Sequence, residues 1–140
     1  MPIPTPYQAW FFGNSAAMAR ELVELVVHGP KRGTAGLLWS IERFPELAPL
    51  PDGYSLVTER DGTPRAVIRT TDIQVRPFGE VDAQFAWDEG EGDRTLEAWR
   101  RGHWAYFTAE CAELGREPSL EMPVVLERFA LLWVVSREGK

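Results

Sequence analysis

The sequence predicts an α+β domain, in which helices and strands are grouped instead of alternating. Apolar residues recur at helical spacing over residues 14–27 and again over residues 93–115. Runs that are typical of strands occupy residues 54–58, 66–75 and 124–135. The order of helices, strands, a helix and a strand lacks the repeated strand–helix–strand unit of an α/β fold, and this indicates the α+β class.

Two helices are predicted in the first part of the chain. Asn14 or Ser15 can cap a helix that runs to about residue 27, and Gly29 is a natural stop for it. Its apolar stripe comprises Met18, Leu22, Leu25 and Val26. Pro30 suits the first turn of a second helix, over residues 30–44, because the missing N–H of proline is not needed there.

The remaining elements follow from turn residues and apolar patterns. Asp61-Gly62 predicts a tight turn that joins the strands over residues 54–58 and 66–75. Asp93 or Thr95 begins a long helix that ends near residues 114–115. The other predicted elements are, in order, a proline-rich loop over 45–53, a short helix over 81–87, an acidic loop over 88–93 and a final buried strand over 124–135.

Bulk properties indicate one domain over residues 1–140, since this length supports a single core and the 44% hydrophobic content is ordinary. The single cysteine excludes an intramolecular disulfide and a multi-cysteine zinc site. No apolar stretch is long enough for a membrane span, and residues 1–7 do not have the pattern of a signal peptide, so we expect a cytoplasmic protein without a membrane partner. The net charge of −6 argues against a protein coated in basic charge for non-specific nucleic-acid binding.

The first candidate site lies at the start of the predicted second helix. Lys31 and Thr34 are three residues apart, which would place them on one helical face. The positive end of a helix dipole disfavours an added cation, so the pair is a candidate base and nucleophile. The same helix start suits an anionic group. In the alternative without function, Lys31 is a solvated surface cation and Thr34 an ordinary helix residue.

The second candidate site is the acidic loop and the helix after it. The loop carries Asp88, Glu89, Glu91 and Asp93, and the helix carries Arg94, Arg100 and Arg101. Three interpretations compete: the carboxylates bind a hard cation, they form salt bridges with the arginines, or one carboxylate acts in a cleft where an arginine holds an anionic ligand. The apolar face of the helix includes Leu96, Trp99, His103, Phe107 and Leu114, so His103 is either a core histidine or a site residue.

Several motifs together resemble the ASCH domain family, in particular its branch of uncharacterised bacterial proteins with an EGEGD motif. The motifs are Gly29-Pro30-Lys31 with Thr34, Ala86-x-x-Glu89-Gly90-Glu91-Gly92-Asp93, Trp99-Arg100, His103-Trp104, Phe107, Met122-Pro123 and Glu127-x-Phe129. They cover nearly the whole chain. The resemblance implies a PUA-like fold, a small and mostly antiparallel β-barrel flanked by helices, with a ligand cleft between barrel and helices.

The resemblance also implies a function. PUA-like domains are related to domains that bind RNA or modified bases, so the expected partner is RNA or a modified nucleoside. Some ASCH members are amidohydrolases that act on N4-acetylcytidine with a Lys, a Thr and a Glu, which here correspond to Lys31, Thr34 and Glu89. Glu91 is an alternative to Glu89. No cofactor and no metal are expected.

Two further functions and the ligand contacts complete the prediction. Other family members are ribonucleases, and here Lys31, Arg100 and His103 would surround the scissile phosphate. The last alternative is a non-catalytic module that binds RNA or a protein partner. Arg100, His103 and Glu91 are candidate ligand contacts, and Trp39 is a candidate platform for stacking on a base, as are Trp99 and Trp104. The oligomeric state stays open between monomer and dimer.

Overall fold

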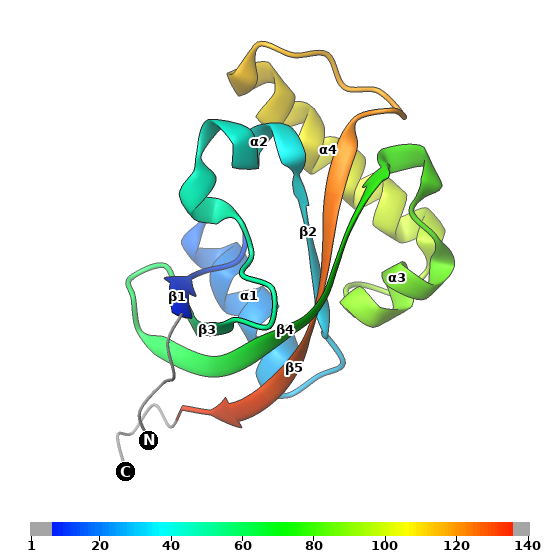
Figure 1. Ribbon diagram of the computed structural model, residues 1–140. Helices are drawn as coiled ribbons and strands as arrows, with labels where there is room; N and C mark the ends of the chain where they lie inside the picture. The colour runs from blue at the N-terminus through cyan, green and yellow to red at the C-terminus, as the bar shows by residue number, and fades with distance from the viewer. Residues whose placement is uncertain (1–6, 136–140) are drawn as a thin grey trace.

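The computed structural model describes residues 7–135. The expectation that residues 1–7 are not a signal peptide falls mostly on residues 1–6, which lie outside this range together with residues 136–140. The elements are β1 (Tyr7–Trp10), α1 (Ala16–Val27), β2 (Gly33–Leu37), α2 (Leu38–Arg43), β3 (Tyr54–Thr58), β4 (Pro64–Pro77), α3 (Ala83–Glu89), α4 (Leu96–Leu114) and β5 (Pro123–Val134), with short 3₁₀ turns at Pro45–Leu47 and Phe78–Glu80 (Figure 1). None of the helices among the described residues has the length and apolar character of a membrane span.

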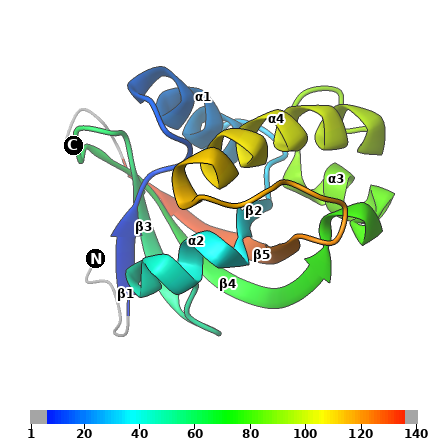
Figure 2. The same cartoon turned by 90° about the horizontal axis from the view of Figure 1, so that it is seen from above.

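The five strands form one strongly curved sheet in the order β1-β3-β4-β5-β2. The pair of β1 and β3 is parallel, and the other three pairs are antiparallel. Strands β1 and β2 are the two edges, so the sheet is a half-barrel that stays open between them. Helix α4 lies between α1 and α3 (Figure 2). The predicted α+β class and the PUA-like, mostly antiparallel barrel with flanking helices are confirmed.

Helix ends follow the predicted capping residues. The Ser15 side chain accepts a hydrogen bond from the backbone N–H of Met18 and so caps the start of α1. Thr95 caps the start of α4 in the same way. Gly115 ends α4 in the left-handed conformation that glycine adopts readily. The most buried residues of α1 are Ala19, Val23 and Val26. The predicted stripe is therefore slightly rotated, and two of its members, Met18 and Leu22, line a cavity instead.

The predicted helix over residues 30–44 is wrong in its first half. Residues 33–37 form the edge strand β2, which pairs antiparallel with β5, and the helix α2 begins only at Leu38. The cause is tertiary. Gly33 lies where a Cβ atom would be 3.4 Å from the Phe85 ring and 3.2 Å from the Glu127 carbonyl, so this strand position favours a residue without a side chain. Lys31 and Thr34 consequently share no helical face, and the predicted helix start beside Lys31 is absent. Its Nζ instead lies 3.4 Å from the carbonyl of Glu89, the last residue of α3, where the helix dipole favours a cation.

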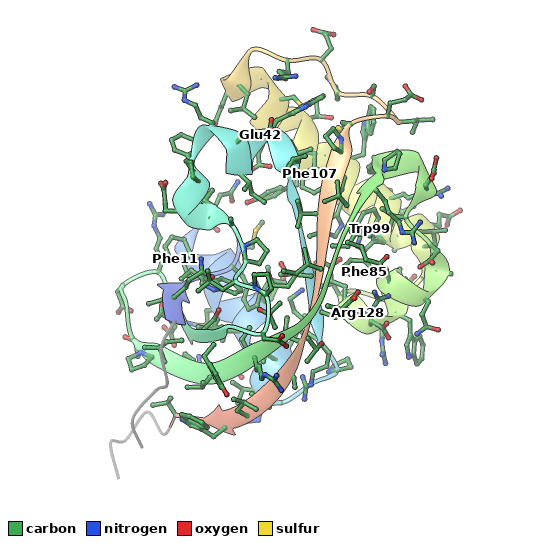
Figure 3. The ribbon with its side chains drawn as sticks, in the orientation of Figure 1. Phe11, Glu42, Phe85, Trp99, Phe107 and Arg128 are labelled. Atoms are coloured by element: carbon green, nitrogen blue, oxygen red, sulfur yellow. The ribbon has the colours of Figure 1, made fainter. Side chains whose placement is uncertain are left out.

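Two apolar clusters fill the space between the sheet and the helices. One joins α3 and α4 to β2 and β5, and the side chains of Phe85, Trp99 and Phe107 meet there (Figure 3). The other lies under α1 and includes Val23, Val26, Val57, Ala66, Ile68 and Phe129. Buried apolar surface of this kind is the main favourable term in folding. Leu126 of the first cluster and Phe129 of the second are three residues apart on β5, so the two clusters lie on opposite faces of this strand.

Candidate functional site

Two adjoining cavities form one cleft beside α4. The smaller, of about 350 Å³, is lined by Glu89, Glu91 and His103 among others, and we call it the charged lobe. The larger, of about 590 Å³, is lined by both edge strands of the sheet, and we call it the edge lobe. The residues that line both lobes are Phe12, Gly13, Thr34, Ala35 and Tyr106. Both volumes fall in the range of small-molecule sites, about 300–1,000 Å³.

Lys31 lies next to the charged lobe with its side chain fully buried. Its Nζ donates to the Gly33 carbonyl at 2.7 Å and to Glu91 Oε2 at 2.5 Å, and it lies 3.7 Å from Glu89 Oε2. The ring of Phe12 covers the ammonium, with its centroid 5.1 Å away. A buried ammonium needs several such partners because it has lost its hydration. Lys31 is therefore an internal side chain held by these partners, and the alternative of a solvated surface lysine is wrong.

Glu89 is the last residue of α3 and is 1% exposed. Its carboxylate accepts from the indole N–H of Trp99 and lies 3.2 Å from Nε2 of His103. Burial acts to raise the pKa of Glu89, but the charges of Lys31 and His103 and the hydrogen bonds from His103 and Trp99 outweigh burial and hold this pKa below its ordinary value. The charged lobe thus contains a carboxylate that is ionised at neutral pH.

His103 presents both ring nitrogens to oxygen acceptors. Nδ1 lies 2.9 Å from the Trp99 carbonyl, which can only accept, and Nε2 lies 3.2 Å from Glu89 Oε1. The ring also stacks on Trp99, with centroids 4.1 Å apart. Burial acts to lower the pKa of His103, but the charges of Glu89 and Glu91 and the hydrogen bonds to Glu89 and Trp99 raise it overall. An imidazolium that donates from both nitrogens satisfies this geometry.

Glu89, Glu91 and His103 bring three potential metal ligands within 4.8 Å of one another. Their negative charge already has an internal partner, because the Lys31 ammonium lies 2.5 Å from Glu91 and 3.7 Å from Glu89. His103 in addition directs Nε2 toward Glu89. We therefore interpret the cluster as a charge network of the protein itself, in which the lysine has the place that a hard cation would take.

Thr34 connects this network to the rest of the cleft. It lies on β2 directly opposite Glu127 of β5, and it lines both lobes. Gly36, two residues along the same strand, lines the edge lobe on the same face. The three predicted catalytic residues thus gather in one place: Thr34 and Glu89 line the charged lobe, and Lys31 contacts the carboxylates of that lobe.

The edge lobe has aromatic walls and a polar floor. Trp10, Phe11, Phe12 and Tyr106 are its aromatic lining residues. The carboxyl group of Glu127 belongs to the floor, and the Thr70 hydroxyl donates to it at 2.6 Å. Burial, with a smaller contribution from the Glu110 and Glu113 charges, raises the pKa of Tyr106 to about 12, so its phenol keeps its proton at neutral pH.

Two predicted ligand contacts lie outside the lining of either lobe. Arg100 is exposed and donates to the carbonyls of Gly79 and Val81, at 3.1 and 3.3 Å. Trp39 packs on the core, and the guanidinium of Arg116 lies 4.5 Å from its ring centroid. Of the three tryptophans predicted to stack on a base, Trp99 is the one that lines the cleft.

The acidic loop also differs from the predicted salt bridges with the arginines that follow it. Asp88 pairs with Arg128 of β5 at 2.9 Å, Glu91 pairs with Lys31, and Asp93 caps the turn at Thr95. Arg94 stacks over the exposed ring of Trp87 instead, 3.5 Å from its centroid.

Sequence reasoning missed Glu127, Glu110, Tyr106 and Phe12 as cleft residues. Two signals were available. Glu127 is a charged residue within an otherwise apolar strand pattern, and such residues are seldom buried without a reason. Tyr106 follows His103 by three residues, so the two share a helical face. Phe12 lies in a loop and has no periodic pattern that would indicate its position.

Comparisons with known proteins agree with this architecture. The family model of the ASCH domain matches residues 8–133. The solved structure of an ASCH domain from Lactobacillus crispatus JV V101 is 33% identical, with a TM-score of 0.83, over 91% of this chain and 80% of that one. A protein from Enterococcus faecalis V583 is 29% identical, with a TM-score of 0.82, over 96% of this chain and 80% of that one. No curated protein matches the chain.

The ASCH domain is a PUA-like fold that is generally linked to RNA binding. The match spans nearly all of the described chain, and the curved five-stranded sheet with its flanking helices has the same fold as these structures. The chain therefore belongs to the ASCH domain family.

Proposed function

We propose that the cleft binds the base of a nucleoside or of single-stranded RNA. The observation that carries this proposal is the composition of the edge lobe, in which aromatic walls from β1 and α4 enclose the polar groups of Thr34 and Glu127. Proteins that recognise single-stranded RNA stack its bases on aromatic rings and read their edges with hydrogen bonds. The general link between the ASCH domain and RNA supports the same choice of ligand.

Binding is expected to depend on the base more than on the phosphate backbone. The chain has a net charge of −6, and the cationic groups of the charged lobe, Lys31 and His103, are matched by the carboxylates of Glu89 and Glu91. Phosphate binding relies on unpaired cations and weakens steeply with salt. A free nucleoside should therefore be bound, and its affinity should change little with salt.

The test is a titration of nucleosides and short single-stranded RNAs, followed by tryptophan fluorescence because Trp10 and Trp99 line the cleft. Saturable quenching that is nearly unchanged between low and high salt supports the proposal. A folded protein that gives no response to any nucleoside or RNA contradicts it.

Hydrolysis of an acylated nucleoside is a second candidate function, favoured by the gathering of Thr34, Lys31 and Glu89. In this reaction the Thr34 oxygen attacks the amide carbonyl, Lys31 takes the hydroxyl proton once it has passed its own to a carboxylate, and Glu89 relays a proton to the amine as the C–N bond breaks. Water then releases the acyl group from Thr34. A ribonuclease is less favoured because Arg100 lies outside the lining of either lobe.

The hydrolase test uses N4-acetylcytidine with the wild type and with Thr34→Val, Lys31→Ala and Glu89→Ala. Loss of cytidine release in folded variants supports the mechanism. Hydrolysis that survives Lys31→Ala refutes it. Because Lys31 and Glu89 are buried and their removal can unfold the chain, Thr34→Val is the decisive variant. Release of fragments from a labelled RNA would favour the ribonuclease instead.

A further inference from the structure

Glu127 is a buried carboxyl group in the middle of an apolar strand. It is 7% exposed, and its neighbours Leu126 and Phe129 belong to the two apolar clusters. A carboxyl group at such a position costs stability unless it has partners. Glu127 has no role in the proposed hydrolysis. It also makes no direct contact with the charge network around Lys31. Because Glu127 lines the edge lobe, a contact with a bound ligand would explain its presence there.

The surroundings of Glu127 hold its carboxyl group in one position. The Thr70 hydroxyl donates to Oε2 at 2.6 Å, and Thr34 lies opposite on the adjacent strand. Burial raises the pKa of Glu127, although the hydrogen bond from Thr70 and the charge of Lys31 both act to lower it. The protonated form is thus favoured more than in a solvent-exposed glutamate. A protonated carboxyl group offers an O–H donor and a carbonyl acceptor side by side.

A second carboxyl group lines the same lobe from α4. Glu110 Oε1 is buried and has no hydrogen-bond partner among the described residues. Burial, with a smaller contribution from the Glu113 charge, raises the pKa of Glu110 as well. A buried oxygen without a partner destabilises the fold, and a ligand that supplies the missing donor removes this cost. The lobe is therefore suited to a ligand with N–H groups.

From this arrangement we infer that Glu127 is the residue that reads the hydrogen-bonding edge of the bound base, while the aromatic walls hold the faces of its ring. The ligand class is a planar base that presents a donor and an acceptor next to each other, as uracil and cytosine do. The inference rests on the proposed function and adds the recognition residue. The same edge carries the acyl group of an acylated cytidine, which would then lie near Thr34.

The test compares uridine with 3-methyluridine, and cytidine with N4,N4-dimethylcytidine, in calorimetric titrations. Each methylated partner keeps the ring and loses the donor on its edge. The wild type should prefer the parent nucleosides by about tenfold. Glu127→Gln, which keeps a donor and an acceptor, should retain that preference. The double variant Glu127→Met/Thr70→Val replaces both partners by apolar groups, so it leaves no buried polar group unpaired, and it should lose the preference.

Glu121→Met is the matched control, since Glu121 is exposed and lies outside the lining of both lobes. It should bind as the wild type does. A double variant that is folded and still prefers the parent nucleosides overturns the role of Glu127 alone. Failure of the wild type to bind any nucleoside overturns the proposed function and this inference with it.

Discussion

The His103 ring shows how single side chains set the properties of the charged lobe. Its two nitrogens face the Trp99 carbonyl and the Glu89 carboxylate, so the charged form of the ring is the one that makes both hydrogen bonds. Glu89 in turn keeps its own negative charge because His103 and Lys31 lie beside it. The two groups stabilise the fold only while both are ionised.

This coupling predicts a pH dependence of stability. The raised pKa of His103 means that its contribution is complete below about pH 6.5 and is lost as the pH rises through the pKa in the folded state. The lowered pKa of Glu89 means that its contribution is lost only in acid, as the pH falls through the pKa in the folded state. His103→Gln should therefore reduce the free energy of unfolding by about 1–3 kcal/mol near pH 6, and by less near pH 9.

Urea unfolding at a series of pH values measures this difference. His28→Gln is the matched control, because His28 is the only other histidine of the chain and its side chain is exposed. The control should lose much less stability than His103→Gln, because the His28 side chain is exposed. A loss for His103→Gln that is equal at all pH values would show that the ring acts through packing and not through its charge.

At the scale of elements, the turn after α3 determines where Lys31 lies. Gly90 ends α3 with a φ of 74°, and a Cβ atom there would lie 2.7 Å from the Lys31 backbone. Gly92, two residues later, has a φ of 59°, but no atom outside the local chain lies within 4 Å of a Cβ at that position. The two glycines of the EGEGD motif thus have the same backbone requirement and different surroundings.

Alanine substitutions separate these two requirements. Gly92→Ala should cost about 1–2 kcal/mol, from the left-handed conformation alone. Gly90→Ala should cost clearly more, because the segment that contains Lys31 would have to move as well. Chemical denaturation of both variants gives the comparison. Equal losses would mean that the close approach to Lys31 is not important for the fold.

The elements also show what local sequence can predict. Ser15, Thr95 and Gly115 are capping residues, and they gave the ends of α1 and α4 because caps depend on neighbours in the sequence. Strand β2 differs from the predicted helix because Thr34 is the one strand former among its five residues and because it pairs with β5, far away in the sequence. Pairing of that kind overrides local propensity.

At the scale of the whole molecule, the site arises because the curved sheet does not close. Strands β1 and β2 are edges that line the edge lobe, and α2, the segment after it and α4 line the rest. Lys31, Glu89, Glu91 and His103 could be predicted from spacing and family resemblance. The edge lobe could not, because β1, β2, β5 and α4 contribute to it from distant parts of the chain.

The most direct test of a base-binding cleft is to fill it. Gly36 lines the edge lobe, and a Cβ atom there would meet no atom within 4 Å, so Gly36→Phe should place a ring in the lobe without unfolding the chain. Ala112→Phe, at an exposed position of α4, is the control for an added ring. Calorimetric titration with uridine and cytidine should show affinity reduced by more than about tenfold in Gly36→Phe and unchanged in Ala112→Phe. Unchanged affinity in a folded Gly36→Phe variant would contradict the central claim.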